Sequence, residues 1–241
     1  MDTVNFKKDK VKVIAHRGLS GLECENTCAA FVAAANRSYF GIETDVHVTK
    51  DGKIIVFHDD NTIRMTGKKK IIEKTRYSVL KKMLLKNPRI DENRSDYYMP
   101  DLYDYISICK KYGKIAVLEI KNLMEEKYIQ KIVDEIKQLD YVYSTVFISF
   151  KMDNLITLRK LIPDAKIQFL TGQENIDEEI FDIMKEHRFD LDIKYRSLTK
   201  EVVDKVHSMG LKVNCWTCDD KGDAENLVNM GVDYITTNIL E

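Results

Sequence analysis

The chain has 241 residues, and its 38 Lys and Arg residues nearly balance 39 Asp and Glu residues, so the formal net charge is −1. Apolar residues make up 44% of the sequence, which is enough for a substantial core and excludes global disorder. The near-zero net charge also argues against a nucleic-acid binder that works by bulk electrostatic attraction.

The N-terminal sequence and the cysteines are used to predict the cellular compartment. No apolar run precedes the first strand-like segment, so no signal peptide is visible, and no stretch reaches the roughly 18 uninterrupted apolar residues of a membrane span. We therefore expect a cytoplasmic protein whose five cysteines are reduced thiols. Cys215 and Cys218 have the CxxC spacing, but the sequence has no second CxxC that would complete a zinc site.

Strand-like apolar runs alternate with amphipathic helical runs almost to the end of the chain. The expected strands, in chain order, are 11–15, 41–46, 115–120, 145–149, 166–170, 190–193, 211–215 and 232–236, with a further extended piece at 53–58 after the Asp51-Gly52 turn. The expected helices are 28–36, 101–112, 125–139, 152–161, 177–187, 199–209 and 220–230, the last two closed by Gly210 and Gly231.

This alternation predicts the fold class. Strands that alternate with helices through short connections form a parallel sheet, and eight such units in about 240 residues favour a closed barrel. We predict an α/β protein, a (β/α)8 TIM barrel that forms one domain over 1–241. The alternative is a doubly wound open sheet, which the absence of a GxGxxG after the first strand makes less attractive.

The segment 59–99 interrupts the alternation and is predicted to be an insertion after the second barrel strand. Residues 61–94 hold 11 Lys and Arg against 3 Asp and Glu, a local balance of +8, and a helix is expected near 78–85. The segment is either a solvated flap or a cover that attracts anionic substrate. Ile71-Ile72 and Met83-Leu84-Leu85 either pack on the barrel, which we favour, or contact an anionic membrane.

Carboxylates are expected where the second and third barrel strands end. Side chains at the C-terminal ends of barrel strands converge, and Glu43, Asp45 and Glu119 would meet there because strand side chains alternate with period two. Three clustered carboxylates repel one another unless a cation lies between them. Their all-oxygen ligation indicates Ca²⁺ or Mg²⁺, with Mn²⁺ as a further candidate, rather than zinc. The alternative is an ordinary ion-pair network with Arg17 or Lys121.

Two histidines stand beside this expected metal site. His16 ends the first strand and His58 the extended piece, and imidazoles titrate near neutral pH, so the pair can supply a general base and a general acid. Arg17 and Lys121 supply positive charge suited to a phosphoryl oxygen. This set suits in-line displacement at phosphorus. The other three histidines are interpreted as structural or surface residues.

These residues lie in a series of motifs that resembles a known family, the glycerophosphodiester phosphodiesterases. The N-terminal series is the specific part, and weaker C-terminal pieces follow in the right order over nearly the whole chain. The matching text is His16-Arg17-Gly18, Glu25-Asn26-Thr27, Gly41-Ile42-Glu43-Thr44-Asp45-Val46, Asp51-Gly52, Val56-Phe57-His58-Asp59, Met99-Pro100-Asp101-Leu102, Leu118-Glu119-Ile120-Lys121, Trp216-Thr217 and Gly231-Val232-Asp233.

The resemblance implies a TIM-barrel hydrolase that cleaves a glycerophosphodiester to glycerol 3-phosphate and an alcohol. It implies that one divalent cation, Ca²⁺ or Mg²⁺, is bound by Glu43, Asp45 and Glu119, and that His16 and His58 are the acid/base pair. Arg17 and Lys121 would contact the phosphate, and Trp216 would line the substrate pocket. The chain departs from the family pattern at Cys24, where proline is common, and at Asn238, where aspartate is common.

Two other functions remain as alternatives. One is a lysophospholipase D or phospholipase-type phosphodiesterase that uses the same site on lipid. The other is a barrel that has kept the fold without catalysis, which would be expected to lose a ligand or a histidine. We expect a small-molecule glycerophosphodiester as the substrate and no nucleic-acid partner. Peripheral membrane contact is an alternative that we do not favour. The sequence predicts neither the alcohol head group nor the oligomeric state.

Overall fold

The computed structural model describes residues 2–87 and 94–241. Eight parallel strands close into a barrel, because β1 pairs with both β9 and β2 while the other strands pair in sequence order. The barrel strands are β1 (Lys12–Ala15), β2 (Gly41–Val48), β4 (Ile115–Ile120), β5 (Thr145–Ser149), β6 (Lys166–Thr171), β7 (Asp190–Lys194), β8 (Val213–Trp216) and β9 (Tyr234–Thr237). The predicted (β/α)8 barrel is therefore confirmed, and the open sheet was the wrong alternative.

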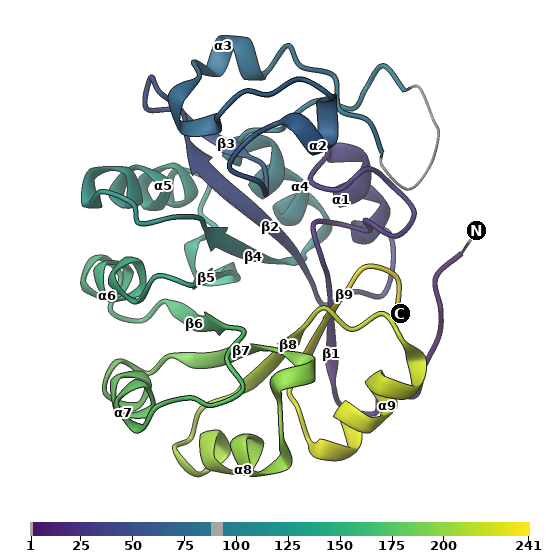
Figure 1. The fold of residues 1–241 in the computed structure, drawn as a ribbon, viewed down its shortest axis with the longest axis vertical. Helices are drawn as coiled ribbons and strands as arrows, with labels where there is room; N and C mark the ends of the chain where they lie inside the picture. The colour runs from purple at the N-terminus through teal and green to yellow at the C-terminus, as the bar shows by residue number, and fades with distance from the viewer. Residues whose placement is uncertain (1, 88–93) are drawn as a thin grey trace.

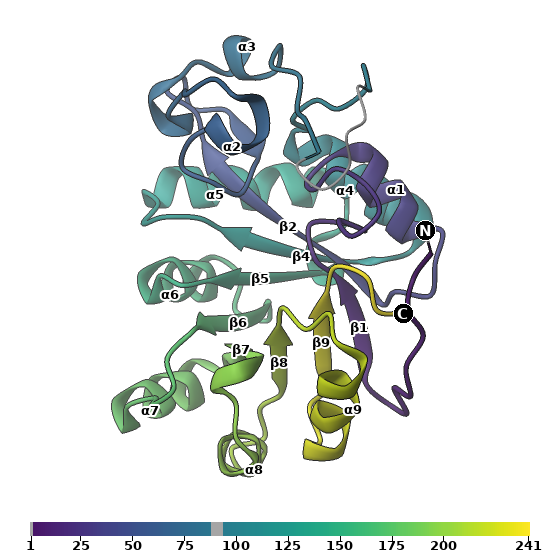
Figure 2. The ribbon, with the colours of Figure 1, turned by 45° about the vertical axis from the view of Figure 1, so that its right-hand side comes forward.

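Helices surround the strands, as Figures 1 and 2 show. They are α1 (Cys28–Ala35), α4 (Leu102–Tyr112), α5 (Glu126–Gln138), α6 (Met152–Leu161), α7 (Glu178–His187), α8 (Lys200–Ser208) and α9 (Lys221–Met230), with short 3-10 turns η2 (Val142–Ser144) and η3 (Tyr195–Ser197). Their buried faces pack on the outside of the strands and form the larger hydrophobic core. A smaller apolar cluster fills the barrel interior, with Ile14, Val117, Ile148 and Leu170 among its members.

Local sequence signals explain where several helices begin and end. Thr27 caps α1 by accepting a hydrogen bond from the backbone N–H of Ala30 at 3.2 Å, which threonine does readily at this position. Asp101 forms a capping box with Asp104 at the start of α4. Gly231 closes α9 in the left-handed conformation, whereas Met209, one residue before the predicted Gly210, caps α8.

The segment expected to be an insertion lies between β3 (Ile54–Val56) and α4, and its residues 88–93 fall outside the described part of the chain. β3 pairs antiparallel with β2 outside the barrel, and α2 (Ile63–Thr66), η1 (Ile72–Lys74) and α3 (Tyr77–Leu80) follow it. Both views place these elements together beyond β2.

The segment has its own small core, to which Ile55, Met65, Ile72, Leu80 and Leu85 contribute. Ile72 and Leu85 are therefore buried, but in the segment's own core and not in the larger core around the barrel strands, whereas Ile71 and Leu84 remain about two-fifths exposed. The helix predicted near 78–85 is wrong beyond Leu80. Leu84 instead pairs with Tyr98 in an antiparallel bridge. The next residue, Leu85, donates its backbone N–H to the Tyr97 carbonyl at 2.7 Å, and its side chain lies in the small core.

Two features bear on the sequence-based expectations about compartment. All five cysteines lie in the described part of the chain and are free thiols, as expected. None of the helices in the described ranges combines the length and the apolar composition that a bilayer span requires.

Candidate active site

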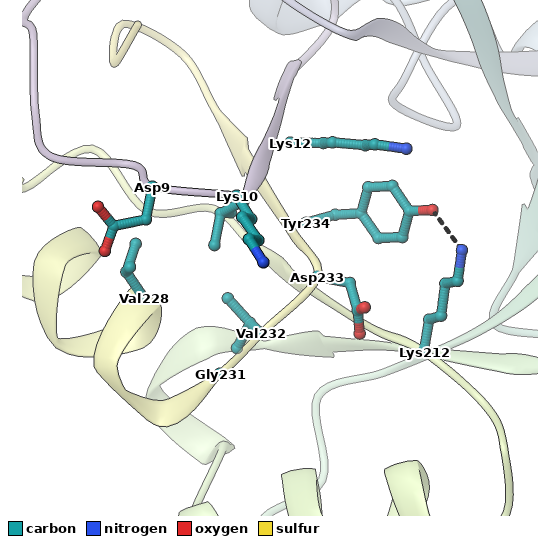
Figure 3. A pocket seen from close by; sticks show the side chains of 10 residues that line it. Asp9, Lys10, Lys12, Lys212, Val228, Gly231, Val232, Asp233 and Tyr234 are labelled. Carbon is teal, nitrogen blue, oxygen red and sulfur yellow. Dashed lines mark hydrogen bonds between the residues drawn. The ribbon is translucent and has the colours of Figure 1, made fainter.

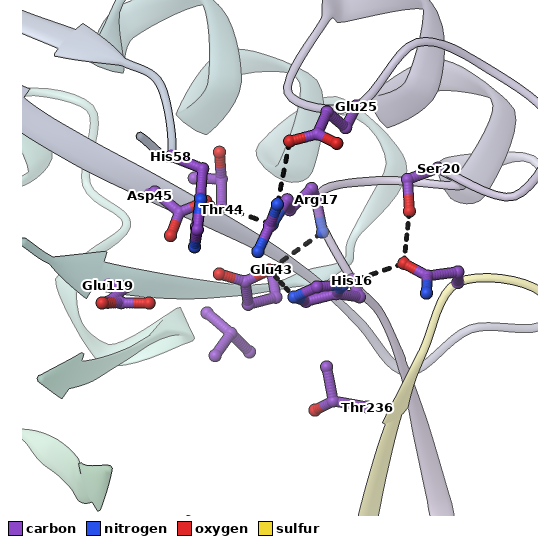
Figure 4. A network of polar contacts seen from close by, with 12 residues as sticks. His16, Arg17, Ser20, Glu25, Glu43, Thr44, Asp45, His58, Glu119 and Thr236 are labelled. Carbon is purple, nitrogen blue, oxygen red and sulfur yellow. Dashed lines mark hydrogen bonds and ion pairs between the residues drawn. The ribbon is translucent and has the colours of Figure 1, made fainter. Parts of the chain in front are cut away.

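A cavity of about 140 Å³ opens at the C-terminal ends of the barrel strands. One side is apolar and is lined by Ile148, Phe150, Leu170 and Trp216. The opposite side is polar and brings together predicted site residues from β1, β2, β4 and the turn after β3, namely His16, Arg17, Glu43, His58 and Glu119. Figure 4 shows these polar side chains gathered along β2, with Glu119 facing them from the neighbouring strand β4.

The backbone explains why the three acids meet. Glu43 and Asp45 lie two residues apart on β2 and therefore share its inner face, and Asp45 pairs in register with Glu119 on β4. Each of the three offers a carboxylate oxygen within 4.8 Å of the others, and all three are buried. The predicted carboxylate cluster is thus present, with the spacing that a single hard cation requires.

Electrostatics in this cluster favour a cation. Burial and the neighbouring Asp45 charge raise the pKa of Glu119 to about 8, and the same causes raise the pKa of Glu43 well above its usual value. Burial opposes ionisation of Asp45 as well, but the charges of Arg17, His58 and Lys121 hold its pKa below the usual value. Two buried acids that resist ionisation beside an ionised third indicate a site that a divalent cation would complete.

Lys121 lies against the same carboxylates. Its Nζ is 2.8 Å from Glu119 Oε1 and 3.5 Å from Asp45 Oδ1. Asp45 Oδ1 is buried and accepts no hydrogen bond from the residues the structure describes, so it remains available as a ligand. The ion pairing that the sequence offered as an alternative is therefore present, since Arg17 Nε also lies 3.7 Å from Asp45 Oδ2, but the raised pKa values of Glu43 and Glu119 indicate that these two cations do not fully compensate the cluster. The donor set fits a hard divalent cation, which Glu43, Asp45 and Glu119 would hold.

His16 is oriented by an amide. Its Nδ1 lies 2.8 Å from Asn238 Oδ1, which also accepts a hydrogen bond from the Ser20 hydroxyl at 2.6 Å. The Asn238 amide nitrogen donates to Asp219 at 2.6 Å, which fixes the amide orientation and makes Nδ1 of His16 the donor. Nε2 then faces Glu43 at 4.0 Å. Burial and the nearby Arg17 charge lower the pKa of His16 to about 4.

His58 is oriented by a carboxylate. Its Nδ1 lies 2.7 Å from Asp59 Oδ1, so Nδ1 donates and the other ring nitrogen is left for chemistry. Burial lowers the pKa of His58, and the charges of Arg17 and Lys121 act in the same direction against those of Asp45 and Asp59. The two predicted histidines thus flank the carboxylate cluster and both line the cavity.

Arg17 is held by contacts on both its backbone and its side chain. Its backbone N–H donates to Glu43 at 2.9 Å, and its guanidinium donates to Glu25 at 2.8 Å. The residue adopts a left-handed backbone with φ of 54°, an uncommon conformation for a residue other than glycine. Gly18 follows it with φ of 76°, and a Cβ there would lie 2.6 Å from the Ala30 backbone. The His-Arg-Gly motif therefore has a steric reason as well as a chemical one.

Trp216 lies on the apolar side of the cavity, as expected. Its ring meets Phe150 edge to face with 5.7 Å between centroids, and its indole N–H donates to the Asp192 carbonyl at 3.4 Å. Phe150 is about two-fifths exposed, so the pair forms an apolar edge at the mouth of the cavity.

Four residues of the site had no predicted role. Asn26 donates to Asp45 at 2.8 Å and accepts from the Thr44 hydroxyl at 2.7 Å, so it fixes the position of one carboxylate of the cluster. Glu25 holds Arg17, and Asn238 orients His16. The signal for Glu25 and Asn26 was their place in the Glu-Asn-Thr motif. The signal for Asn238 was its position at the end of the last strand, where a departure from the family pattern stood out.

The fourth such residue is Asp192 on β7. It lines the cavity, is 2% exposed, and its Oδ1 has no hydrogen-bond partner among the described residues. Burial raises the pKa of Asp192 well above its usual value, and the nearby Glu119 charge acts in the same direction. A single aspartate inside a strand gave no sequence signal for a cavity residue.

The remaining histidines match their structural interpretation. His47 is buried between Glu73 and the backbone of His58, and His207 pairs with Asp233 at 2.9 Å. His187 stacks on Phe189. None of these three rings lines the cavity at the C-terminal strand ends.

A larger cavity, of about 780 Å³, lies at the opposite end of the barrel (Figure 3). It is lined by the starts of β1 and β9, where Lys12 and Lys212 flank Tyr234. Its walls hold neither of the two catalytic candidates nor any of the three clustered carboxylates. The candidate catalytic histidines and two of the three clustered carboxylates therefore line the smaller cavity and not this one.

Comparison with known proteins agrees with this arrangement. The sequence model of the Glycerophosphoryl diester phosphodiesterase family matches residues 16–241. A glycerophosphodiester phosphodiesterase of Caldanaerobacter subterraneus is 30% identical over 231 residues, which cover 95% of this chain and 94% of that protein.

Solved structures show the same fold. An Oleispira antarctica phosphodiesterase in complex with the product sn-glycerol-3-phosphate superposes with a TM-score of 0.86 at 27% identity, covering 94% of this chain and 92% of that one. A glycerophosphodiester phosphodiesterase from Parabacteroides distasonis superposes with a TM-score of 0.81 at 30% identity, covering 96% and 94% of the two chains.

Proposed function

Because the chain belongs to the glycerophosphoryl diester phosphodiesterase family, we propose that it is a metal-dependent enzyme that hydrolyses glycerophosphodiesters to glycerol 3-phosphate and an alcohol. The observation that carries the proposal is the cluster of three buried carboxylates within 4.8 Å of one another, beside a cavity that two of them line together with two oriented imidazoles. We further propose that 59–99 is an insertion within a single barrel domain spanning 1–241.

Glu43, Asp45 and Glu119 would hold the cation, Ca²⁺ or Mg²⁺ with Mn²⁺ as a further candidate. When bound, such a cation would act as a Lewis acid on the phosphoryl group and would offset the negative charge on its oxygens. Arg17, which lines the cavity, and Lys121, which lies against Glu119, contribute fixed positive charge and would contact the phosphate.

His16 and His58 would carry the protons. One imidazole takes a proton from the attacking water as the water oxygen bonds to phosphorus, and the other gives a proton to the alcohol oxygen as the old P–O bond breaks, so the products are glycerol 3-phosphate and the alcohol. Nδ1 of each ring is hydrogen-bonded to a partner outside the cavity, Asn238 for His16 and Asp59 for His58. Nε2 of each ring is therefore the atom that exchanges the proton.

The neutral wall suits the organic part of the substrate. Trp216 would line the pocket beside Phe150, and both present apolar edges toward the mouth. The lipid alternative, a lysophospholipase D or phospholipase-type activity, is not favoured, because the relatives named above are glycerophosphodiester phosphodiesterases. A non-catalytic barrel is disfavoured because Glu43, Glu119, both histidines and Arg17 line one cavity, and Asp45 lies beside the two glutamates.

The proposal is tested by following glycerol 3-phosphate release from glycerophosphocholine with and without EDTA. We expect activity that chelation abolishes and that Ca²⁺ or Mg²⁺ restores. Turnover that survives thorough chelation would rule out the metal mechanism. A panel of head groups, with a lysophospholipid as one member, separates soluble diesters from lipid as the preferred substrate.

A further inference from the structure

Arg64, on α2 of the segment between β3 and α4, contacts two carboxylates at once. Its Nη1 and Nη2 donate to the two oxygens of Glu25 at 2.8 and 2.7 Å, which is a bidentate pair. Its Nε donates to Asp59 Oδ2 at 2.7 Å, and Nη2 also reaches Asp59 Oδ1 at 3.1 Å. One guanidinium therefore joins the turn after β3 to the loop between β1 and α1.

Each of these carboxylates holds a residue of the active site. Glu25 Oε1 also accepts from Arg17 Nη1 at 2.8 Å, and Asp59 Oδ1 accepts from His58 Nδ1 at 2.7 Å. The contacts form a continuous chain from Arg17 through Glu25, Arg64 and Asp59 to His58. Figure 4 shows the Glu25 end of this chain, with Arg17 pointing from it toward the cavity.

The charges explain why the connection needs an arginine. Glu25 is buried, and although burial opposes its ionisation, Arg64 and Arg17 hold its pKa below the usual value. Asp59 is half-buried. Burial opposes its ionisation as well, but Arg64 and His58 hold its pKa below the usual value. Without Arg64, two carboxylates would lose their main cation and the fixed positions that its planar group gives them. A lysine has one charged centre and cannot form both pairs with the same geometry.

We propose that Arg64 is a positioning residue of the active site, which holds Asp59 and Glu25 so that the His58 imidazole and the Arg17 guanidinium keep fixed places on the polar side of the cavity. Because this rests on the proposed function, it assigns part of the catalytic geometry to the segment 59–99. The basic segment then contributes one specific contact in addition to its general positive charge.

Arg94 provides a matched control. It also ties the segment to the loop between β1 and α1, through Glu23 at 3.0 Å, and it also pairs with a second carboxylate, Asp96, at 2.7 Å. Its side chain is 36% exposed, against 37% for Arg64. Neither Glu23 nor Asp96 lines the cavity. Loss of Arg94 therefore removes a similar tie without touching His58 or Arg17.

The experiment compares Arg64→Gln, Arg64→Lys and Arg94→Gln by kcat and KM for glycerophosphocholine at saturating cation. We expect Arg64→Gln to lower kcat about ten- to a hundredfold, the loss typical of one charge-assisted contact, with Arg64→Lys intermediate. Arg94→Gln should stay within about twofold of the unsubstituted protein. Equal kcat values for Arg64→Gln and Arg94→Gln would overturn the inference.

A second readout does not depend on turnover. In protein labelled with ¹⁵N-histidine, the His58 Nδ1 proton bonded to Asp59 should give a downfield resonance that Arg64→Gln weakens or shifts and Arg94→Gln leaves in place. An unchanged resonance in Arg64→Gln would also overturn the inference. If the protein is inactive on every diester, the proposed function fails while this readout still tests Arg64.

A double-mutant cycle separates positioning from general stability. If Arg64 acts through Asp59, the loss of kcat caused by Arg64→Lys should be smaller in an Asp59→Asn background than in the unsubstituted protein. Fully additive losses would contradict the chain of contacts. This comparison uses the conservative variant, so it also decides the matter if Arg64→Gln does not fold.

Discussion

Replacing Glu119 by glutamine should raise the free energy of unfolding of the metal-free protein. It should also reduce the stabilisation that a divalent cation gives. In the metal-free protein, burial and Asp45 raise the pKa of Glu119 from 4.5 to about 8. The folded state therefore keeps a proton that the unfolded chain releases above pH 4.5. Stability is lost as the pH rises through this window, because the native state binds more protons than the unfolded state.

The magnitude follows from the width of that window. Each pH unit between the two pKa values costs about 1.4 kcal/mol, so Glu119 destabilises the metal-free protein by up to about 4 kcal/mol more at pH 8 than at pH 5. Glutamine has no such proton to bind. We expect Glu119→Gln to be more stable than the unsubstituted protein in EDTA, with a gain that grows from pH 5 to pH 8.

With a divalent cation present, the unsubstituted protein should become the more stable of the two. A hundredfold excess over Kd stabilises a folded protein by about 3 kcal/mol, and the unsubstituted protein should show this gain. Glu119→Gln lacks one ligand and should show little of it, with little activity. The assay is urea unfolding at pH 5 and pH 8, in EDTA and with Ca²⁺ or Mg²⁺.

Asp190→Asn serves as the control for this experiment. Burial raises the pKa of Asp190 to about 6, and its Oδ1 accepts from the backbone of Lys212 at the far end of the barrel. Its replacement should change the pH dependence and leave the cation response intact. A Glu119→Gln protein that gained no stability at pH 8, or that a cation stabilised as much as the unsubstituted protein, would refute the reasoning.

Three further predictions concern the cavity. His16→Ala and His58→Ala should each lower kcat by about 10²–10⁴, and wild-type turnover in either variant would exclude that histidine as acid or base. Asp192→Asn should leave the free energy of unfolding at pH 7 unchanged or higher, because burial disfavours the charged form of the acid and asparagine carries no charge, and a loss above about 2 kcal/mol in urea unfolding would contradict this. Trp216→Ala should raise KM about tenfold with a smaller effect on kcat, whereas Trp216→Phe should keep KM, and a KM unaffected by alanine would remove Trp216 from the substrate pocket.

Much of the fold and of the cavity follows from local patterns in the sequence. Apolar strand runs alternate with helical runs at short spacing, and this periodicity alone predicts a parallel barrel. Because parallel strands end on one face, Glu43, Asp45 and Glu119 could be assigned to one cluster before any coordinates were known. His16 and His58 follow in the same way from their positions at the ends of extended segments.

The contacts that orient these groups are of a different kind. Arg64, which also contacts Asp59, is 39 residues away from Glu25 in the chain. Asn238 is 222 residues away from His16. Local periodicity carries no information about such pairs, since it is the same whichever partner a charged side chain meets. The helix predicted near 78–85 was wrong for a similar reason, because the bridge between Leu84 and Tyr98 outweighed the local helical pattern.

The sequence by itself therefore determined which chemical groups this protein has and on which end of its barrel they lie, because strand periodicity and strand direction are local properties. Only the tertiary structure decided how each group is held. The tautomers of the two histidines, the pKa values of the buried acids and the contact from Arg64 all depend on neighbours that folding brings together from distant parts of the chain.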